Sequence, residues 1–377
     1  MKSVTILLIA FFAFGCKELY VPPVNSTSNS FLVVEGNLDP GGPTKVMLTR
    51  TFSLDAAARI TPENNAEVLV EGKDNSIRML SFSGNGLYIS SSLNLVAGNE
   101  YRLRIKTISG KAYMSEYIKA KIAPAIDSIS WDKVDKGVQI YANTGDSSNS
   151  TIYYRWDYDE TWEIRSPKPS NLIFQNAPLL PPIRNRILPQ EDVYLCWKYH
   201  SSTEILLANS TRLQSDIINK APLLLIPTSD EKLLSRYSVL VRQYALEKKV
   251  YDYFELMKKN TENIGGFFSS QPSEIRGNLY SVSDPSEFVI GFITSSTVPE
   301  QRIFILNSEV SPWPYVPNCE DVIVRNHRDS IQAAVNTGYL VYKDDAVAPA
   351  PIYYFFSTPA CVDCTSRGGS TVKPSYW

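Results

Sequence analysis

The chain has 377 residues and a formal net charge of −2, which gives no electrostatic reason to expect binding to nucleic acid. Its apolar fraction of 44% is ordinary for a globular protein, and its length favours two domains. The 22 Tyr and 15 Phe residues, together with frequent Val, Ile and Thr, favour a mainly β chain.

The first fifteen residues have the features of a secretory signal peptide. Lys2 supplies a positive charge, and residues 4–14 form an apolar run too short to cross a hydrocarbon core of about 30 Å. Cys16 follows directly, as in the bacterial lipoprotein box, where the thiol is acylated before cleavage. We therefore expect a signal peptide at residues 1–15 and lipidation of Cys16, which would anchor the protein to a lipid bilayer. A secretory signal with an incidental cysteine is the alternative, because Ala13 stands where Leu is usual.

Residues 16–30 are expected to form a lipidated tether. The pair Lys17 and Glu18 partly resembles the short export signals that place lipoproteins of Bacteroidetes on the outer face of the outer membrane. The Pro, Ser and Asn residues that follow have the composition of a flexible linker. The expected location is the outer membrane, at the cell surface, with the periplasmic face as the alternative.

Residues 31–122 are expected to form a small antiparallel β-sandwich of the immunoglobulin-like kind. Strand-like runs such as FLVVEGNL, TKVMLTRTF, AEVLVEG and YRLRIKT recur between Gly- and Asn-rich turns. In the last run Tyr101, Leu103 and Ile105 alternate with Arg102 and Arg104, which predicts one buried face and one solvated face.

Residues 123–377 are expected to form a second, fibronectin-III-like sandwich. Pro124 interrupts the strand pattern, and the runs IDSISWD, GVQIYANT and IYYRWDYDETWEI start a new series. Apolar residues at helical spacing predict an inserted amphipathic helix near residues 246–263, capped by Asn263 and the following glycines. The runs FVIGFI and RIFI are expected as closing strands.

Two irregular segments are candidates for binding. Residues 166–190 are rich in Pro and lack periodicity, so they are expected to be a long loop that either packs across the sheet or binds a ligand. The run PWPYVP at residues 312–317 offers Trp313 and Tyr315 for stacking on sugars or on a protein partner. A proline-stiffened edge that covers the core is the alternative for this run.

Several stretches carry a family resemblance. RYSVLVRQYAL, NTENIGGFFSSQPSEIRGN and the tail CVDCTSRGGSTVKPSYW are the most specific of them. With CWKYHSSTEILLANSTRL, they resemble the Bacteroidetes lipoprotein family known as domain of unknown function four-two-four-nine. The resemblance implies an outer-membrane lipoprotein found with TonB-dependent receptors, and it implies no catalytic residues.

Four cysteines remain after Cys16, namely Cys196, Cys319, Cys361 and Cys364, and an even number in an oxidising compartment predicts disulfides. A bond within the Cys361–Cys364 pair would close only a tiny loop, so we expect each of these two to reach back, one to Cys196 and one to Cys319. Such bonds would pin the C-terminal tail to the second sandwich. A thioredoxin-like redox site and a zinc site are the weaker alternatives, because the pair does not open a helix after a strand and no second close cysteine pair exists.

Little in the sequence points to catalysis. His200 and His327 are the only histidines, and no HExxH, GxSxG or phosphate-loop signature is present. Asp157, Asp159 and Glu160 could supply acid–base carboxylates or bind calcium, but carboxylates are also common on solvated strands. We expect neither a cofactor nor a metal.

The leading hypothesis is therefore a non-enzymatic lipoprotein that binds a ligand or docks on a TonB-dependent transporter. A structural or adhesive envelope protein is the second hypothesis. A hydrolase whose carboxylates lie far apart in the sequence is the third.

Overall fold

The computed structural model describes residues 30–52, 61–178, 181–262 and 275–377, and within them the chain is mainly β, as the sequence predicted. The predicted signal peptide, Cys16 and nearly all of the tether lie outside the described residues. So do Asn263 and the glycines that were expected to cap the helix. Among the described residues, no helix is both long enough and apolar enough to cross a membrane.

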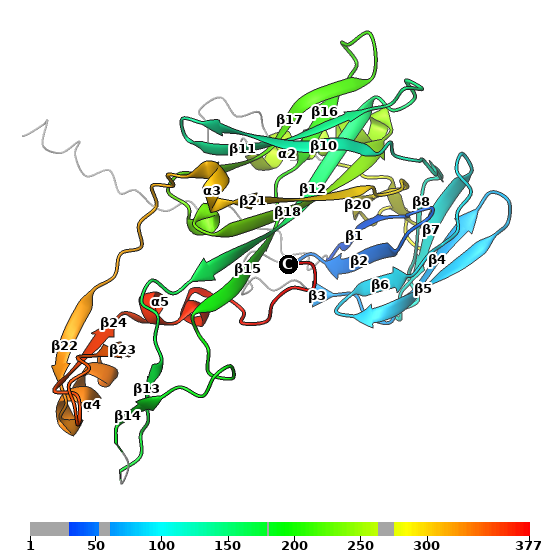
Figure 1. Ribbon diagram of the computed structural model, residues 1–377. Helices are drawn as coiled ribbons and strands as arrows, with labels where there is room; N and C mark the ends of the chain where they lie inside the picture. Colours follow the sequence, from blue (N-terminus) through cyan, green and yellow to red (C-terminus); the bar gives the residue numbers. More distant parts are fainter. Residues whose placement is uncertain (1–29, 53–60, 179–180, 263–274) are drawn as a thin grey trace, which may run out of the picture.

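An eleven-stranded sheet forms the N-terminal module, drawn mainly in blue and cyan in Figure 1, with β20 in yellow. Its order is β19-β8-β7-β4-β5-β6-β2-β1-β20, with β3 beside β2 and β9 beside β7. The predicted alternation in β7 is confirmed, because Tyr101, Leu103 and Ile105 are buried while Arg102 and Arg104 are partly exposed. The strands are β1 (Leu32–Asn37), β2 (Thr44–Arg50), β3 (Thr61–Pro62), β4 (Glu67–Gly72), β5 (Ile77–Gly84), β6 (Leu87–Ser90), β7 (Glu100–Lys106), β8 (Ala112–Ser115), β9 (Ile118–Lys119), β19 (Leu279–Ser281) and β20 (Val289–Thr294).

Two strands of this sheet come from far along the chain, so the predicted range of residues 31–122 is incomplete. β20, which was expected to close the second domain, instead pairs in parallel with β1, and Leu32 lies opposite Val289. β19 pairs with β8 at the other end of the sheet. Gly291 permits the close β1–β20 approach, because a Cβ atom at this position would lie 1.9 Å from the carbonyl oxygen of Val34. A parallel pairing between distant segments leaves no turn signal in the sequence.

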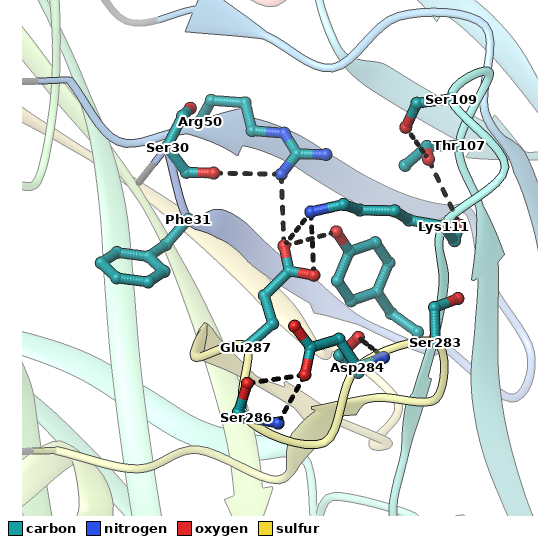
Figure 2. A network of polar contacts seen from close by, with 12 residues as sticks. Ser30, Phe31, Arg50, Thr107, Ser109, Lys111, Ser283, Asp284, Ser286 and Glu287 are labelled. Atoms are coloured by element: carbon teal, nitrogen blue, oxygen red, sulfur yellow. Dashed lines mark hydrogen bonds and ion pairs between the residues drawn. The ribbon is translucent and has the colours of Figure 1, made fainter. Parts of the chain in front are cut away.

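A polar network holds the loop between β19 and β20 against the start of the described chain (Figure 2). The carboxylate of Glu287 accepts hydrogen bonds from Lys111 at 3.0 Å and from the Tyr113 hydroxyl at 2.9 Å. Arg50 lies 3.9 Å from the same carboxylate and donates to the carbonyl of Ser30 at 3.2 Å. Burial and the Glu287 carboxylate raise the pKa of Tyr113 to about 12, so the hydroxyl keeps the proton it donates.

Two further sheets pack face to face around one core to form the second module. One face contributes Val138 and Ile140, and the other contributes Tyr154, Trp156 and Tyr237. The three-stranded sheet contains β10 (Ile126–Val134), β11 (Gly137–Gly145) and β17 (Ile217–Pro227). The five-stranded sheet contains β15 (Leu195–Ser201), β12 (Tyr153–Arg165), β18 (Arg236–Leu246), β21 (Glu300–Leu306) and β16 (Leu206–Asn209), which pairs with β12, and the short helix η1 (Glu231–Leu233) precedes β18.

The predicted amphipathic helix is confirmed as α2 (Lys248–Glu262). Val250 and Tyr253 of its apolar stripe are buried, and Phe254 packs beside them. The stripe contacts not only the second module but also Phe292 of β20, so the helix lies at the junction of the two modules.

A third, small sheet was not predicted, because residues 123–377 were expected to form a single domain. Figure 1 shows this sheet projecting from the second module beside a hairpin. Its order is β22-β24-β23, and Ile331 of α4 is fully buried against it. The elements are β22 (Asp321–Arg325), α4 (Arg328–Asn336), β23 (Leu340–Asp344) and β24 (Tyr353–Ser357), with the hairpin β13 (Leu172–Phe174) and β14 (Ile183–Asn185), and with α3 (Asn307–Val310), α5 (Pro359–Val362) and η2 (Cys364–Arg367) nearby in sequence.

One disulfide joins the C-terminal segment to the second module, and another closes the chain around the small sheet. Cys196 of β15 bonds to Cys364, and Cys319 bonds to Cys361. Both tail cysteines therefore reach back, which confirms the expected arrangement and leaves no close thiol pair for redox chemistry or zinc at the tail.

Candidate functional site

A cleft of about 960 Å³ opens where the N-terminal sheet, α2 and the five-stranded sheet meet. One wall comes from β1, β2 and β20, the other from β12 and β18, and α2 closes one side. Cavities that hold small molecules commonly have 300–1,000 Å³, so this cleft is at the large end of that range.

A row of charged side chains follows the outer face of the five-stranded sheet into the cleft. Strand periodicity turns Tyr154, Trp156 and Tyr158 toward the core, so Asp157 and Asp159 point the other way. The strand register then places Arg242 of β18 directly opposite Asp157.

Arg242 is the centre of this row. Its guanidinium lies 3.2 Å from Asp157 and 2.8 Å from Glu300, and it also bonds the carboxylate of Asp159. Burial opposes ionisation of the guanidinium, but these carboxylates outweigh burial and raise the pKa of Arg242. For Asp159, burial again opposes the charge, while hydrogen bonds from Arg242 and Ser201 lower its pKa. The row is therefore a set of fixed, ionised pairs.

Aromatic rings line the side of the cleft next to α2. The guanidinium carbon of Arg155 lies 4.2 Å from the ring centroid of Tyr244 and 5.0 Å from that of Phe254. Tyr253 and Phe292 pack together at 4.9 Å between centroids. Cations held over ring faces combine an apolar surface with a fixed charge.

The N-terminal wall is built from alternate residues of β1 and β2. Glu35 and Lys45 are exposed there, and burial together with the charge of Glu35 raises the pKa of Tyr253 on α2 to about 12. The side chain of Asn37 fixes this wall to the segment after β20, because its amide donates to the Ser296 carbonyl at 2.8 Å and its oxygen accepts from Thr294 at 2.8 Å.

The three carboxylates suggested by the sequence do not meet at one site. Glu160 faces the opposite side of β12 from Asp157 and Asp159 and is only 1% exposed. Its carboxylate accepts from Lys232 at 2.9 Å and from Tyr237 at 2.8 Å, and it lies 3.0 Å from Nδ1 of His200. This buried cluster has its charges compensated inside the module.

No group of three or more potential metal ligands exists among the described residues. His327, the other histidine, is exposed ahead of α4 and lies 3.9 Å from Asp329.

The predicted aromatic surface is only partly available. Trp313 packs against the core of the second module, and its indole donates to the Asp230 carbonyl at 2.7 Å. Tyr315, two residues further, is half-buried. These contacts agree with the alternative in which the proline-rich run covers the core.

No pattern in the sequence indicated the cleft. Its walls come from segments more than two hundred residues apart, such as Val33 and Arg242, and each segment carries only ordinary strand periodicity. From the sequence alone, the charged cleft residues Arg155, Arg242 and Glu35 look like ordinary solvent-exposed strand residues. Their shared site is visible only when the two modules are seen together.

A family model described as Domain of unknown function (DUF4249) matches residues 17–302. This match covers the N-terminal module, the cleft and most of the second module, and it ends before the small C-terminal sheet. No curated protein matches the chain.

Proposed function

The chain belongs to the family described as Domain of unknown function (DUF4249), and from this premise we propose that it is a lipid-anchored binding protein whose cleft between the two modules holds a ligand. The protein works in the outer membrane, attached through Cys16, as an accessory of a TonB-dependent transporter. It does not catalyse a reaction on its ligand.

The cleft itself is the observation that carries this proposal. It joins an aromatic side to a row of ionised groups, and such a combination of apolar surface with a few placed polar groups is typical of ligand sites. Arg242, Asp157 and Asp159 are already paired with one another, so they offer fixed charges for orienting a ligand rather than a free acid and base.

The transporter partner rests on the resemblance of the sequence to lipoproteins that occur with TonB-dependent receptors. A tethered binding protein beside a receptor would raise the local concentration of cargo at its entrance. Residues 16–30 can span at most about 50 Å when fully extended, so the start of the folded modules would lie within that distance of the anchor.

A pull-down from solubilised outer membranes tests the partner. Tagged full-length protein is expected to recover a TonB-dependent receptor in stoichiometric amount, while the Cys16→Ala variant, which cannot be acylated, is expected to lose both the membrane and the receptor. Recovery of the lipidated protein alone, from the correct membrane, would refute the accessory role.

Native mass spectrometry of the protein purified from its own membranes tests the ligand. A bound small molecule is expected in the wild type and in Lys106→Glu, an exposed charge reversal on the same sheet but outside the cleft. Lys45→Glu, the matched reversal inside the cleft, is expected to reduce the bound fraction at least fivefold. Equal occupancy in the two variants would place the ligand elsewhere.

A further inference from the structure

We propose that the small C-terminal sheet carries a second binding site, which takes an acidic carbohydrate chain. The sheet that provides Tyr342 and Lys343 lies beyond the segment matched by the family model, which ends at residue 302, whereas the opposite side of the site, with Lys168 and Asn171, lies within that segment. The site does not depend on the function proposed for the cleft. Three observations support it: a cavity, an aromatic sheet face and a lysine that forms no ion pair with the residues that the structure describes.

The cavity has a volume of about 420 Å³ and lies between β23 and the segment that contains the β13–β14 hairpin. Among its lining residues are two side-chain amides, a carboxylate and two ammonium groups, contributed by Asn171, Asn185, Asp344, Lys168 and Lys343. Side-chain amides donate hydrogen bonds to hydroxyl groups and accept them, and carboxylates accept them. A sugar ring presents hydroxyl groups on every side. The volume suits a few sugar units.

The sheet face beside the cavity is aromatic and open to solvent. Helix α4 covers one face, where Tyr354 and Phe356 are buried, so the intervening residues of β24 point to the other face. Phe355 there lies opposite Ile323 of β22, which is 63% exposed, and Tyr353 is 44% exposed. The Tyr342 ring lies 6.4 Å from the Phe355 ring between centroids, at the edge of the cavity. Such rings offer flat faces for the C–H groups of a sugar.

The charges favour an acidic rather than a neutral sugar. Lys168 already bonds Asp321 at 2.6 Å, so its charge is compensated. Lys343 is exposed and makes no ion pair with any residue in the described part of the chain, and its ammonium lies 5.8 Å from the Phe355 ring centroid. The Lys343 ammonium thus lies beside the stacking surface, where it can bind the carboxylate of a uronic acid unit, while the Asp344 carboxylate of the same lining can accept hydrogen bonds from sugar hydroxyl groups. A single such cation does not suit a dense polyanion.

The fold explains why this site is held in place. The hairpin segment that provides Lys168 and Asn171 is bonded to the sheet, because Ser170 donates to the Val341 carbonyl at 2.9 Å. The disulfide between Cys319 and Cys361 fixes the chain on both sides of the sheet. One side of the cavity is formed by described residues of the proline-rich segment, whose role the sequence left open between packing and binding, namely Lys168, Pro169, Asn171, Leu172 and Asn185.

Isothermal titration calorimetry of the full-length protein in detergent tests the site. The probe is a galacturonic acid trimer, and a neutral galactose trimer is the reference ligand. The acidic trimer is expected to bind at least tenfold more tightly than the neutral one. Lys343→Gln is expected to remove most of that difference in affinity. Tyr342→Ala is expected to lower the affinity for both trimers at least fivefold.

Lys106→Gln, an exposed lysine on the N-terminal sheet, serves as the matched control and is expected to change neither affinity. Lys343 is exposed, so its substitution leaves the fold intact even where Tyr342→Ala unfolds the small sheet. Equal affinity for the two trimers, or an unchanged preference in Lys343→Gln, would refute the proposal that the ligand is acidic. If neither trimer shows saturable binding, the proposal of a carbohydrate site is wrong.

Discussion

The N-terminal sheet and the small C-terminal sheet reach stability by different means. The first buries a large apolar core between many strands and has no disulfide among its described residues. The second buries only a few apolar side chains and is closed by covalent bonds, with a core of Ile183, Val324, Ile331, Val341, Tyr354 and Phe356. The difference teaches that a small β unit can replace missing apolar area with cross-links.

The largest effect is expected from breaking the cross-link. The double variant Cys319→Ala/Cys361→Ala opens a loop that spans 42 residues and should cost about 4 kcal/mol of unfolding free energy, because the unfolded chain regains its entropy. Hydrogen exchange is expected to show lost protection in β22–β24 and unchanged protection in β4 and β7. Equal losses in both sheets would mean that the two do not differ in this way.

A cavity in the larger core is expected to have the next effect. Leu103 is fully buried, so Leu103→Ala should lower the free energy of unfolding by about 3 kcal/mol. Ile108→Ala, at a site that is 72% exposed, is the control and should change it by less than about 0.5 kcal/mol. Chemical denaturation measures both, and a small loss in Leu103→Ala would contradict a core-based stability.

Closure of the N-terminal sheet by β20 can be tested at a glycine. Gly291 has a φ of 117°, and a Cβ there meets the Val34 backbone, so Gly291→Ala should cost about 2 kcal/mol or more. Gly98 also has a positive φ, of 87°, but a Cβ there meets nothing within 4 Å, so Gly98→Ala should cost about 1 kcal/mol from strain alone. Equal losses of thermal stability in the two variants would show that the pairing of β20 with β1 does not depend on the close approach at Gly291.

The smallest expected effect is a loss of stability at acidic pH. We expect it in the second module. Burial of Glu163 opposes its charge, but hydrogen bonds from Ser235 and Arg165 outweigh burial and lower its pKa below the ordinary 4.5. Its stabilising contribution is therefore complete above pH 4.5 and is lost as the pH falls through the lowered pKa.

The dependence of stability on pH between 6 and 3 should weaken in Glu163→Gln. Asp329→Asn, at a side chain that is 90% exposed, is the control and should leave the pH dependence of stability unchanged. Melting temperatures across this range measure the effect, and identical profiles for wild type and Glu163→Gln would exclude Glu163 as a source.

Sequence reasoning succeeded where the signal was local. The alternation in β7, the strand β12 and the helix α2 were predicted within a few residues of their observed bounds, because period-two and period-3.6 apolar patterns reflect burial of one face. The parity of the cysteines and the short loop within Cys361–Cys364 were enough to predict that both tail cysteines reach back.

The sequence by itself determined the mainly β character, the positions of most strands in the first two modules and the helix at their junction. Only the tertiary structure decided that β20 joins β1, that a separate sheet forms after residue 320, and that Arg242, Tyr253 and Glu35 face one cleft. The physical reason is that side-chain periodicity is set by neighbours along the chain. Strand pairing and cavity shape instead depend on which distant segments bury their apolar faces together, and no local pattern records that choice.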